Sequence, residues 1–270
     1  MLILAATPIG NIGDASERLK VTLASARVIA AEDTRTLLQL ANHLSIKLAA
    51  ELISLHEHNE IQKLDRLVQI AKTADLVLVS DAGMPTISDP GFALVRACAE
   101  AGVEIQVVPG PSAVISALAV SGLSTDRFCF EGFLPRKSGE RTRFLESLVT
   151  ETRTMVFFES PHRITESLSD AAKVFGSDRL ASVSRELTKK FEETKRGTLE
   201  ELLDWAQNLK GEMVLVIAGA EPAVWNLEDL VSQVIELKGS GTGLKQAASS
   251  VAKQYGASSS ELYALALKRQ

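Results

Sequence analysis

The chain has 270 residues, 46% of them hydrophobic, and a formal net charge of −5 at pH 7. This length is enough for one large domain or two of ordinary size. The negative charge excludes nucleic-acid binding through a uniformly basic surface but leaves room for a local basic patch. The two cysteines, Cys98 and Cys129, belong to no C-x-x-C pair, and with four scattered histidines they predict neither a zinc site nor a disulfide framework.

The N-terminus shows no signal-peptide pattern, because it lacks a basic start and a long apolar core. No apolar run reaches the roughly 18 residues that would suggest a membrane span. We therefore expect a reduced, cytoplasmic protein with no membrane contact.

Short apolar runs alternate with segments of helical periodicity, which predicts an α/β fold. The expected strands are 2–6, 28–31, 53–55, 76–79, 104–108, 128–133, 154–159, 180–184 and 213–218. The expected helices between them are 15–25, 61–72, 92–101, 114–120 and 198–209.

Residues 76–91, LVLVSDAGMPTISDPG, organise the first half of the chain. They predict a strand buried on both faces, then a loop shaped by two prolines and two glycines, then a helix. Ligands of open α/β sheets bind at such carboxyl ends of parallel strands. An ordinary strand-to-helix connection is the alternative, but two acids and two prolines in one loop favour a ligand site.

Other strand ends also carry polar or turn-forming residues. Residues 10–13 form a G-x-x-G that matches neither the dinucleotide fingerprint nor a phosphate P-loop, so a structural turn explains it. Residues 32–35, EDTR, are consistent with a capped helix start or with a polar cluster at the same sheet edge. In residues 109–113, PGPSA, the prolines predict a tight turn and Ser112 can cap the next helix. His56 and His58 lack the spacing of a helical metal pair, and no metal is expected.

The chain changes domain near residues 122–125, so we expect domains at 1–120 and 121–222. Residues 135–143 carry four positive charges and one negative, which is consistent with a solvated surface or with a patch that contacts phosphate. A helical tail is expected at 223–270, with helices at 227–237, 244–255 and 259–268. The last two resemble a helix-turn-helix but carry too few basic residues to predict DNA binding, and a docking appendage is equally consistent.

Five loop motifs occur in order: TPIGNIGD at 7–14, EDTR at 32–35, SDAGMP and SDPG within 80–91, PGPSA at 109–113, and ESPHR at 159–163. The ordered set resembles the tetrapyrrole methylase superfamily, and within it the branch that methylates a cytidine ribose 2′-oxygen of 16S rRNA. The resemblance covers roughly residues 1–220, and the C-terminal helices also resemble the tail of that branch. It implies two α/β domains of the class III methyltransferase type with S-adenosylmethionine (SAM) in the cleft between them. It also implies a homodimer that acts on the 30S ribosomal subunit.

The resemblance further implies which residues contact SAM. They are Pro8, Ser80, Asp81, Ala82, Gly83, Met84, Ser88, Ser112 and Ala113 in the first domain, and Phe133, Leu134 and Met213 on the adenosine side in the second. Enzymes of this fold that act on tetrapyrroles usually carry Gly-Asp-Pro at the central loop. This chain has Ser-Asp-Ala there, which disfavours a tetrapyrrole acceptor.

Methyl transfer to a ribose needs the hydroxyl oxygen about 3–3.5 Å from the methyl carbon, in line with the sulfur. A base helps, since a hydroxyl is a weak nucleophile. Spacing does not choose among candidates at predicted strand ends, which are Glu32, His58, Glu159, His162 and Glu186. For RNA contacts we expect Arg35, Arg136, Lys137, Arg141, Arg163 and Arg185, because guanidinium groups match phosphate oxygens. An ion pair with a neighbouring acid is the alternative for each arginine.

Two other functions stay open. A precorrin-type tetrapyrrole C-methyltransferase would share the fold and the cofactor but needs a broad apolar trough. A non-catalytic RNA-binding assembly factor would keep the fold without the reaction. A dehydrogenase is disfavoured because both glycine fingerprints are missing.

Overall fold

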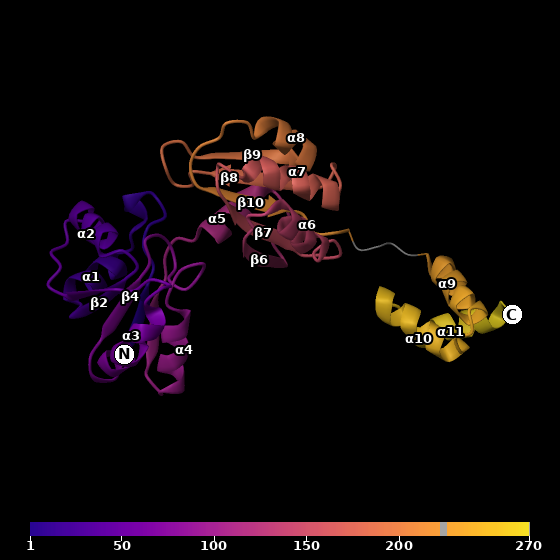
Figure 1. The fold of residues 1–270 in the computed structure, drawn as a ribbon, viewed down its shortest axis with the longest axis horizontal. Coiled ribbons are helices and arrows are strands. Elements are labelled where there is room, and N and C mark those ends of the chain that lie inside the picture. The colour runs from indigo at the N-terminus through magenta and orange to yellow at the C-terminus, as the bar shows by residue number, and fades with distance from the viewer. Residues whose placement is uncertain (222–225, 270) are drawn as a thin grey trace. The chain divides into compact units, whose positions relative to one another are not determined.

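The computed structural model describes residues 1–221 and 226–269, which fall into two compact units, Met1–Ala218 and Gly219–Gln270. In the described part, the first unit holds two five-stranded sheets and the second holds three helices (Figure 1). The α/β class predicted from the sequence is confirmed. No helix in these two ranges has the length and apolar character needed to cross a membrane.

The first sheet is entirely parallel, in the order β3-β2-β4-β1-β5. Its strands are β1 (Leu2–Ala5), β2 (Val28–Ala31), β3 (Glu51–Ser54), β4 (Leu76–Val79) and β5 (Ile105–Val108). Its helices are α1 (Glu17–Ser25), α2 (Thr34–His43), α3 (Glu60–Thr73) and α4 (Phe92–Glu100), with a short 3₁₀ turn η1 (Ile12–Asp14). Every residue of the central strand β4 is buried, as its uninterrupted apolar run predicts.

Two layers of helices cover this sheet. Leu19 of α1 and Leu37 of α2 pack in one core, whereas Leu67 of α3 and Leu94 of α4 pack in another. The helix starts follow local chemistry: the Asp33 side chain accepts a hydrogen bond from the Arg35 amide and caps α2. Because all five strands are parallel, their following loops meet at one edge of the sheet.

The second sheet is mixed, in the order β6-β7-β10-β8-β9, and only its β6–β7 pair is parallel. Its strands are β6 (Phe128–Phe133), β7 (Thr154–Glu159), β8 (Leu180–Arg185), β9 (Glu193–Thr198) and β10 (Met213–Ile217). The helices that pack on it are α5 (Ala113–Ser121), α6 (Ser138–Glu146), α7 (Ile164–Phe175) and α8 (Leu199–Trp205).

The sequence pattern did not predict β9. Its residues, ETKRGT, have no apolar alternation, because an edge strand is held by backbone bonds to β8 rather than by burial of its side chains. The helix expected from 198 to 209 is shorter and ends at Trp205. It starts at Thr198, which forms a capping box with Glu201.

Helix α5 packs on the second sheet, although it lies within the domain that we expected to end at residue 120. Its Val114 and Leu118 share a core with Val156 of β7 and Val214 of β10. We therefore move the proposed boundary between the two sheet domains to the loop at 109–112. The expected boundary at 222/223 falls among residues 222–225, outside the described part.

The second unit is a three-helix cluster of α9 (Leu227–Gly239), α10 (Leu244–Tyr255) and α11 (Ser259–Lys268). Leu230 and Val234 of α9, Val251 of α10 and Leu262 of α11 are buried in a core of their own. Gly256, at a φ of 66°, ends α10, and the Ser258 side chain caps α11.

Candidate active site

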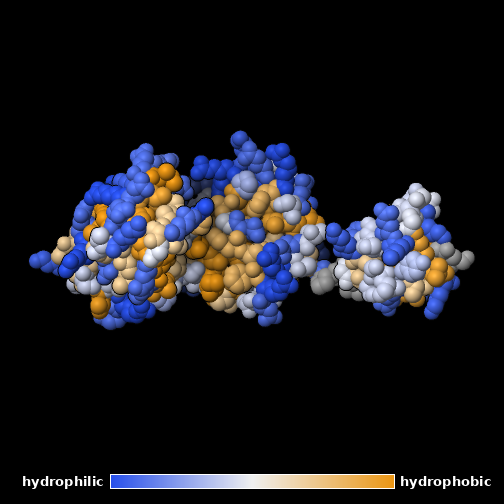
Figure 2. All heavy atoms as spheres, turned by 90° about the horizontal axis from the view of Figure 1, so that it is seen from below, coloured by the Kyte–Doolittle hydropathy of each residue, from blue (hydrophilic) through white to orange (hydrophobic). Residues whose placement is uncertain are grey.

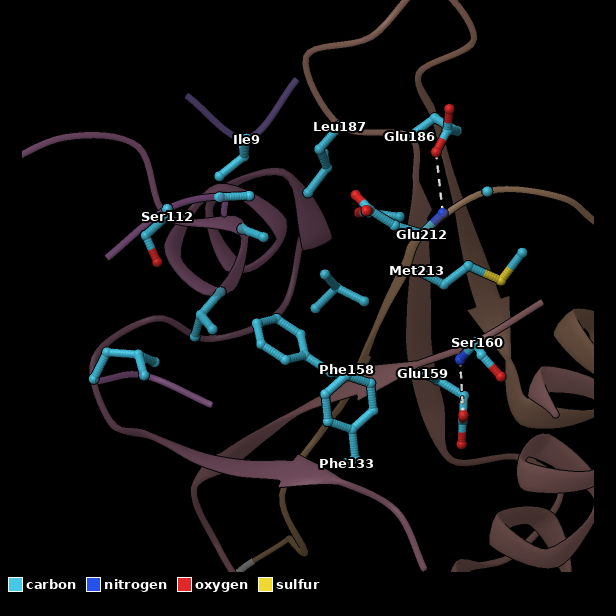
Figure 3. A pocket seen from close by; sticks show the side chains of 18 of the residues that line it. Ile9, Ser112, Phe133, Phe158, Glu159, Ser160, Glu186, Leu187, Glu212 and Met213 are labelled. Carbon is cyan, nitrogen blue, oxygen red and sulfur yellow. Dashed lines mark hydrogen bonds between the residues drawn. The ribbon is translucent and has the colours of Figure 1, made fainter. Parts of the chain in front are cut away.

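A cavity of about 550 Å³ lies between the loops of the two sheets (Figure 3). This volume is typical of a site for one small molecule. The loops that follow strands of the first sheet, and the start of α5 to which the last of them leads, contribute to its lining Ile9, Ala82, Gly83, Met84, Ile87, Asp89, Ser112, Ala113 and Val114. Its second-sheet lining is Phe133, Phe158, Glu159, Ser160, Pro161, Ser184, Glu186, Leu187, Lys189, Gly211, Glu212, Met213 and Val214.

The loop after β4 forms one wall and is held by backbone bonds to the loop after β1. Thr7 and Gly83 exchange two hydrogen bonds, of 2.9 and 3.1 Å, and the Thr7 hydroxyl donates to the Ser80 carbonyl at 3.3 Å. Thr86 and Ser88 adopt positive φ angles of 76° and 61°, which non-glycine residues rarely do. The loop therefore has a fixed, strained path that exposes its Ala82–Met84 segment to the cavity.

The 109–113 loop forms an adjacent wall, and its position depends on Gly110. A Cβ atom there would lie 2.8 Å from the Ala6 Cβ, so only glycine permits this approach. Ser112 precedes α5, but its side chain makes no capping hydrogen bond, so that prediction is wrong. Its side chain instead lines the cavity (Figure 3).

The second sheet supplies an aromatic and apolar wall. The centroid of the Phe158 ring lies 4.9 Å from that of the Phe130 ring and 5.4 Å from that of the Phe133 ring. Phe133, Phe158 and Met213 line the same side of the cavity (Figure 3). Such a wall suits a flat, partly apolar group.

Glu159 is a buried anchor. Its carboxylate accepts hydrogen bonds from the Ser160 amide at 2.8 Å and the Ser167 hydroxyl at 2.6 Å, and it pairs with Arg163 at 2.6 Å. Because these bonds occupy both carboxylate oxygens, Glu159 is better placed to support the cavity wall than to transfer a proton.

Glu186 adopts a φ of 50° on the turn after β8. Its Oε1 atom accepts a hydrogen bond from the Glu212 amide at 3.0 Å (Figure 3). It accepts another from Lys189 at 3.1 Å. Burial acts to raise the pKa of Glu186, but these bonds outweigh it and lower the pKa. Lys189 also pairs with Glu212 at 2.8 Å. Among the described residues Oε2 of Glu186 has no partner, so an ionised oxygen remains available.

The loops after β2 and β4 meet at an acidic edge. The Asp33 amide donates to Asp81 Oδ1 at 3.2 Å, and the Asp81 amide donates to Glu32 Oε2 at 3.3 Å. Burial raises the pKa of both Glu32 and Asp81. Burial, with the charges of Glu32 and Asp81, raises the pKa of Asp89 to about 6, despite a hydrogen bond from Ser80. Residues 32–35 are thus both a capped helix start and a polar cluster.

Of the residues expected to bind a cofactor, those on the main cavity are Ala82, Gly83, Met84, Ser112, Ala113, Phe133 and Met213. Pro8 and Asp81 line a smaller neighbouring cavity. Ser80 and Leu134 are buried beneath the walls, and Ser88 lines neither cavity. Of the catalytic candidates, Glu159 and Glu186 line the main cavity, whereas Glu32, His58 and His162 line neither cavity.

The expected RNA-contacting residues differ in exposure. Arg141 is 1% exposed and pairs with Asp170 at 2.7 Å, so its guanidinium cannot reach a phosphate without unfolding α6, and we remove it from the set. Arg136 and Lys137 are exposed. Arg35 is exposed but pairs with Asp33, and Arg185 pairs with Glu193 at 2.7 Å.

Sequence reasoning missed several lining residues. Phe158 and Ser184 belong to no motif, and Ile9 lies in the 7–14 motif but was not singled out there; only the folded structure brings the three to the cavity. Asp89 is one of the two acidic residues of the central loop that favour a ligand site, so its charge could have identified it as a site residue. Among the described residues, no group of three or more histidine, cysteine, aspartate or glutamate side chains is arranged to hold a metal.

The chain belongs to the tetrapyrrole (corrin/porphyrin) methylase family, whose model matches residues 1–203. It is similar to the ribosomal RNA small subunit methyltransferase I of Mycobacterium tuberculosis (strain CDC 1551 / Oshkosh), with 46% identity over 97% of this chain and 93% of that protein. The Escherichia coli O157:H7 protein of the same name is 41% identical over 100% of this chain and 95% of its own length.

Solved structures show the same fold. The methyltransferase CobJ superposes with a TM-score of 0.61 at 18% identity, over 81% of this chain and 94% of CobJ. Uroporphyrin-III C-methyltransferase from Thermus thermophilus, complexed with S-adenosyl homocysteine, superposes with a TM-score of 0.56 at 16% identity, over 80% of this chain and 96% of that one. The protein is a methyltransferase, and its cofactor is SAM.

The main cavity fits this cofactor chemically. Phe133, Phe158 and Met213 offer an apolar wall for an adenine ring, and Glu186, Glu212 and Asp89 supply negative charge for a sulfonium. The Ala82–Met84 and Ser112–Ala113 segments line the same cavity and carry backbone donors and acceptors.

Proposed function

We propose that the protein transfers a methyl group from SAM to the ribose 2′-oxygen of a cytidine in 16S rRNA of the 30S subunit. The observation that carries the proposal is the near-full-length similarity, at 41–46% identity, to proteins named for ribosomal RNA small subunit methylation. The resemblance of the five ordered loops to the 2′-oxygen branch supports the finer assignment. The setting would be the cytoplasm, where ribosomal subunits are assembled.

The proposed SAM contacts are the cavity-lining members of the expected set, with Asp81 and Pro8 at its border. Bound SAM supplies an activated methyl group, so the protein's main task is positioning. The two loops of the first sheet fix the methionine end, and Phe133 and Met213 fix the adenosine end. Asp89, Glu186 and Glu212 offset the positive charge of the sulfonium.

Among the catalytic candidates, we propose Glu186 as the group that accepts the hydroxyl proton or its hydrogen bond. It lies on the cavity, is ionised, and keeps Oε2 free, whereas Glu159 has both oxygens occupied. Glu32 and His162 would need to act through other groups, because neither lines the cavity. Glu186→Gln should lower turnover much more than SAM affinity, which it weakens only through the charge lost beside the sulfonium. Equal loss of both would make Glu186 a structural residue.

Arg35, Arg136, Lys137, Arg163 and Arg185 remain the proposed RNA contacts. If Arg136, Lys137 and Arg143 meet phosphates, their joint neutralisation should flatten the salt dependence of RNA binding. An unchanged salt dependence would mean that Arg136, Lys137 and Arg143 are ordinary solvent-exposed surface residues.

We propose a homodimer. Exposed apolar side chains outside the main cavity occur on α5 and β6: Ile115 is 52% exposed, and Val120 and Phe128 are 37% exposed each. Figure 2 shows hydrophobic residues gathered on one face of the second-sheet region. Such patches mark interaction surfaces on soluble proteins. Light scattering should give twice the monomer mass, and a monomer at micromolar concentration would contradict the proposal.

The decisive experiment incubates the protein with labelled SAM and 30S subunits that lack the modification. The label should map to one cytidine and remain on the sugar after base removal. Label on a base, or none on RNA, would contradict the assignment. Transfer to a tetrapyrrole alone would favour the alternative enzyme, and SAM-free protein that binds RNA would favour the assembly factor.

A further inference from the structure

A second cavity, of about 230 Å³, adjoins the first. The two cavities share four lining residues, which are Ile9, Ala82, Lys189 and Glu212. The smaller volume lies below the roughly 300–1,000 Å³ of sites for drug-sized ligands. It therefore suits one compact group rather than a macrocycle or a run of nucleotides.

Helix α2 gives this cavity a polar wall. Thr36, Gln39 and His43 line it at i, i+3 and i+7, a spacing that places them on one face of the helix. In the part of the chain that the structure describes, none of these three side chains has a hydrogen-bond partner. Their donors and acceptors are consequently free for a ligand.

The rest of the lining includes the charged residues Asp81, Lys189 and Glu212 as well as an apolar surface. Pro8 and Ile12 from the first loop and Leu40 from α2 form this surface. An apolar surface next to unpaired amide and imidazole groups matches a nucleobase, which has flat faces and a polar edge.

We infer that this cavity holds the single unstacked nucleoside that bears the acceptor hydroxyl. This inference rests on the proposed function. The sugar must lie at the wall shared with the main cavity, because only there does it approach the Ala82 segment proposed to hold the methyl donor. The base then extends toward α2. Gln39 and His43 read its edge and act as specificity residues, since an amide both donates and accepts hydrogen bonds.

The test fills the cavity in the full-length protein. Gln39→Trp places a large ring at an exposed helix position that lines the cavity, and Asn42→Trp is the matched control on the same helix outside it. We expect Gln39→Trp to lower kcat/KM on unmodified 30S subunits by at least about 100-fold, because displacement by about an ångström can have such an effect. SAM affinity by calorimetry should stay as in the wild type, and Asn42→Trp should behave as the wild type in both assays.

Milder variants keep the inference testable if the bulky ring disturbs α2. Gln39→Ala and His43→Ala should each lower kcat/KM roughly three- to tenfold through KM, the effect of a lost neutral hydrogen bond. Undiminished transfer by Gln39→Trp and both alanine variants overturns the inference. Loss of SAM affinity in step with activity also overturns it, because the cavity would then belong to the cofactor. A wild-type protein that methylates no RNA instead refutes the proposed function itself.

Discussion

The Asn11 amide donates a hydrogen bond of 3.0 Å to the Thr188 hydroxyl, which lies 177 positions further along the chain. Asn11 follows β1 and Thr188 follows β8, so this bond joins the two sheet domains beside both cavities. Thr188 adopts a φ of 65°, which is rare for a β-branched residue, so the turn is held by its surroundings.

Loss of this bond should loosen the site without unfolding the protein. We expect Thr188→Ala to weaken SAM binding by about two- to tenfold, the range for one lost hydrogen bond. Thr188→Ser keeps the acceptor and should bind SAM as the wild type does. Calorimetry measures both, and equal affinities for the two variants would show that the bond does not contribute.

SAM affinity should depend on pH through Asp89, whose pKa is raised to about 6 by burial and by the charges of Glu32 and Asp81. Ionised Asp89 attracts the sulfonium, so binding should strengthen from about pH 5 to about pH 7. Asp89→Asn should flatten this dependence in calorimetry; an unaltered profile would assign it to another group. Because the folded pKa is raised, the stability that protonated Asp89 contributes is full below the unfolded pKa of about 3.9 and is lost as the pH rises through about 6.

Arg141 should matter for stability rather than for RNA. We expect Arg141→Ala to lower the free energy of unfolding by about 3 kcal/mol, because it removes the buried cationic partner of Asp170 and leaves only Ser138 and the more distant Lys173. Urea titration measures this, with the exposed Arg143→Ala as control, expected within about 0.5 kcal/mol of the wild type. A similar effect of both variants would contradict the assignment.

The ion pair of Arg141 and Asp170 also predicts that the folded protein loses stability in acid. Burial opposes ionisation of Asp170, but hydrogen bonds from Ser138 and Arg141 outweigh it and lower the pKa. The stability contributed by a depressed pKa is present above the unfolded value of about 3.9 and is lost as the pH falls through the folded value. Arg141→Ala should move this acid loss to higher pH in unfolding measurements.

Gly110 should be required for the wall that carries Ser112. Gly110→Ala brings a Cβ atom within 2.8 Å of the Ala6 Cβ, and we expect it to lower stability by about 1–3 kcal/mol and to weaken SAM binding. Gly139→Ala is the control, because a Cβ atom there meets nothing within 4 Å. Thermal unfolding that shows equal stability for both variants would mean that the loop adapts.

Much of the fold could be predicted from local pattern. The strands at 28–31, 76–79, 128–133 and 154–159 have the predicted bounds, because short runs rich in apolar or aromatic residues mark them locally. The edge strand β9 could not be predicted, since its charged residues carry no period. The position of α5 on the second sheet could not be predicted either, because that packing depends on which sheet buries its small residues.

The candidate site was predictable where motifs mark it and not where packing decides it. The glycines and prolines of the 76–91 and 109–113 loops signal their shapes. By contrast, a run of basic residues cannot show that Arg141 points inward to Asp170, a residue 29 positions away. Phe158 likewise reaches the cavity only because β7 lies beside β6 in the second sheet.

The carboxylates on the main cavity also affect the departure of the used cofactor. In the proposed site Asp89, Glu186 and Glu212, partly offset by Lys189, attract a donor that carries a positive sulfur, but the demethylated product is neutral at that atom. The electrostatic part of binding is therefore lost at the moment of transfer. The protein is expected to release spent cofactor readily and to exchange it for a fresh molecule, so that product inhibition stays weak during repeated turnover.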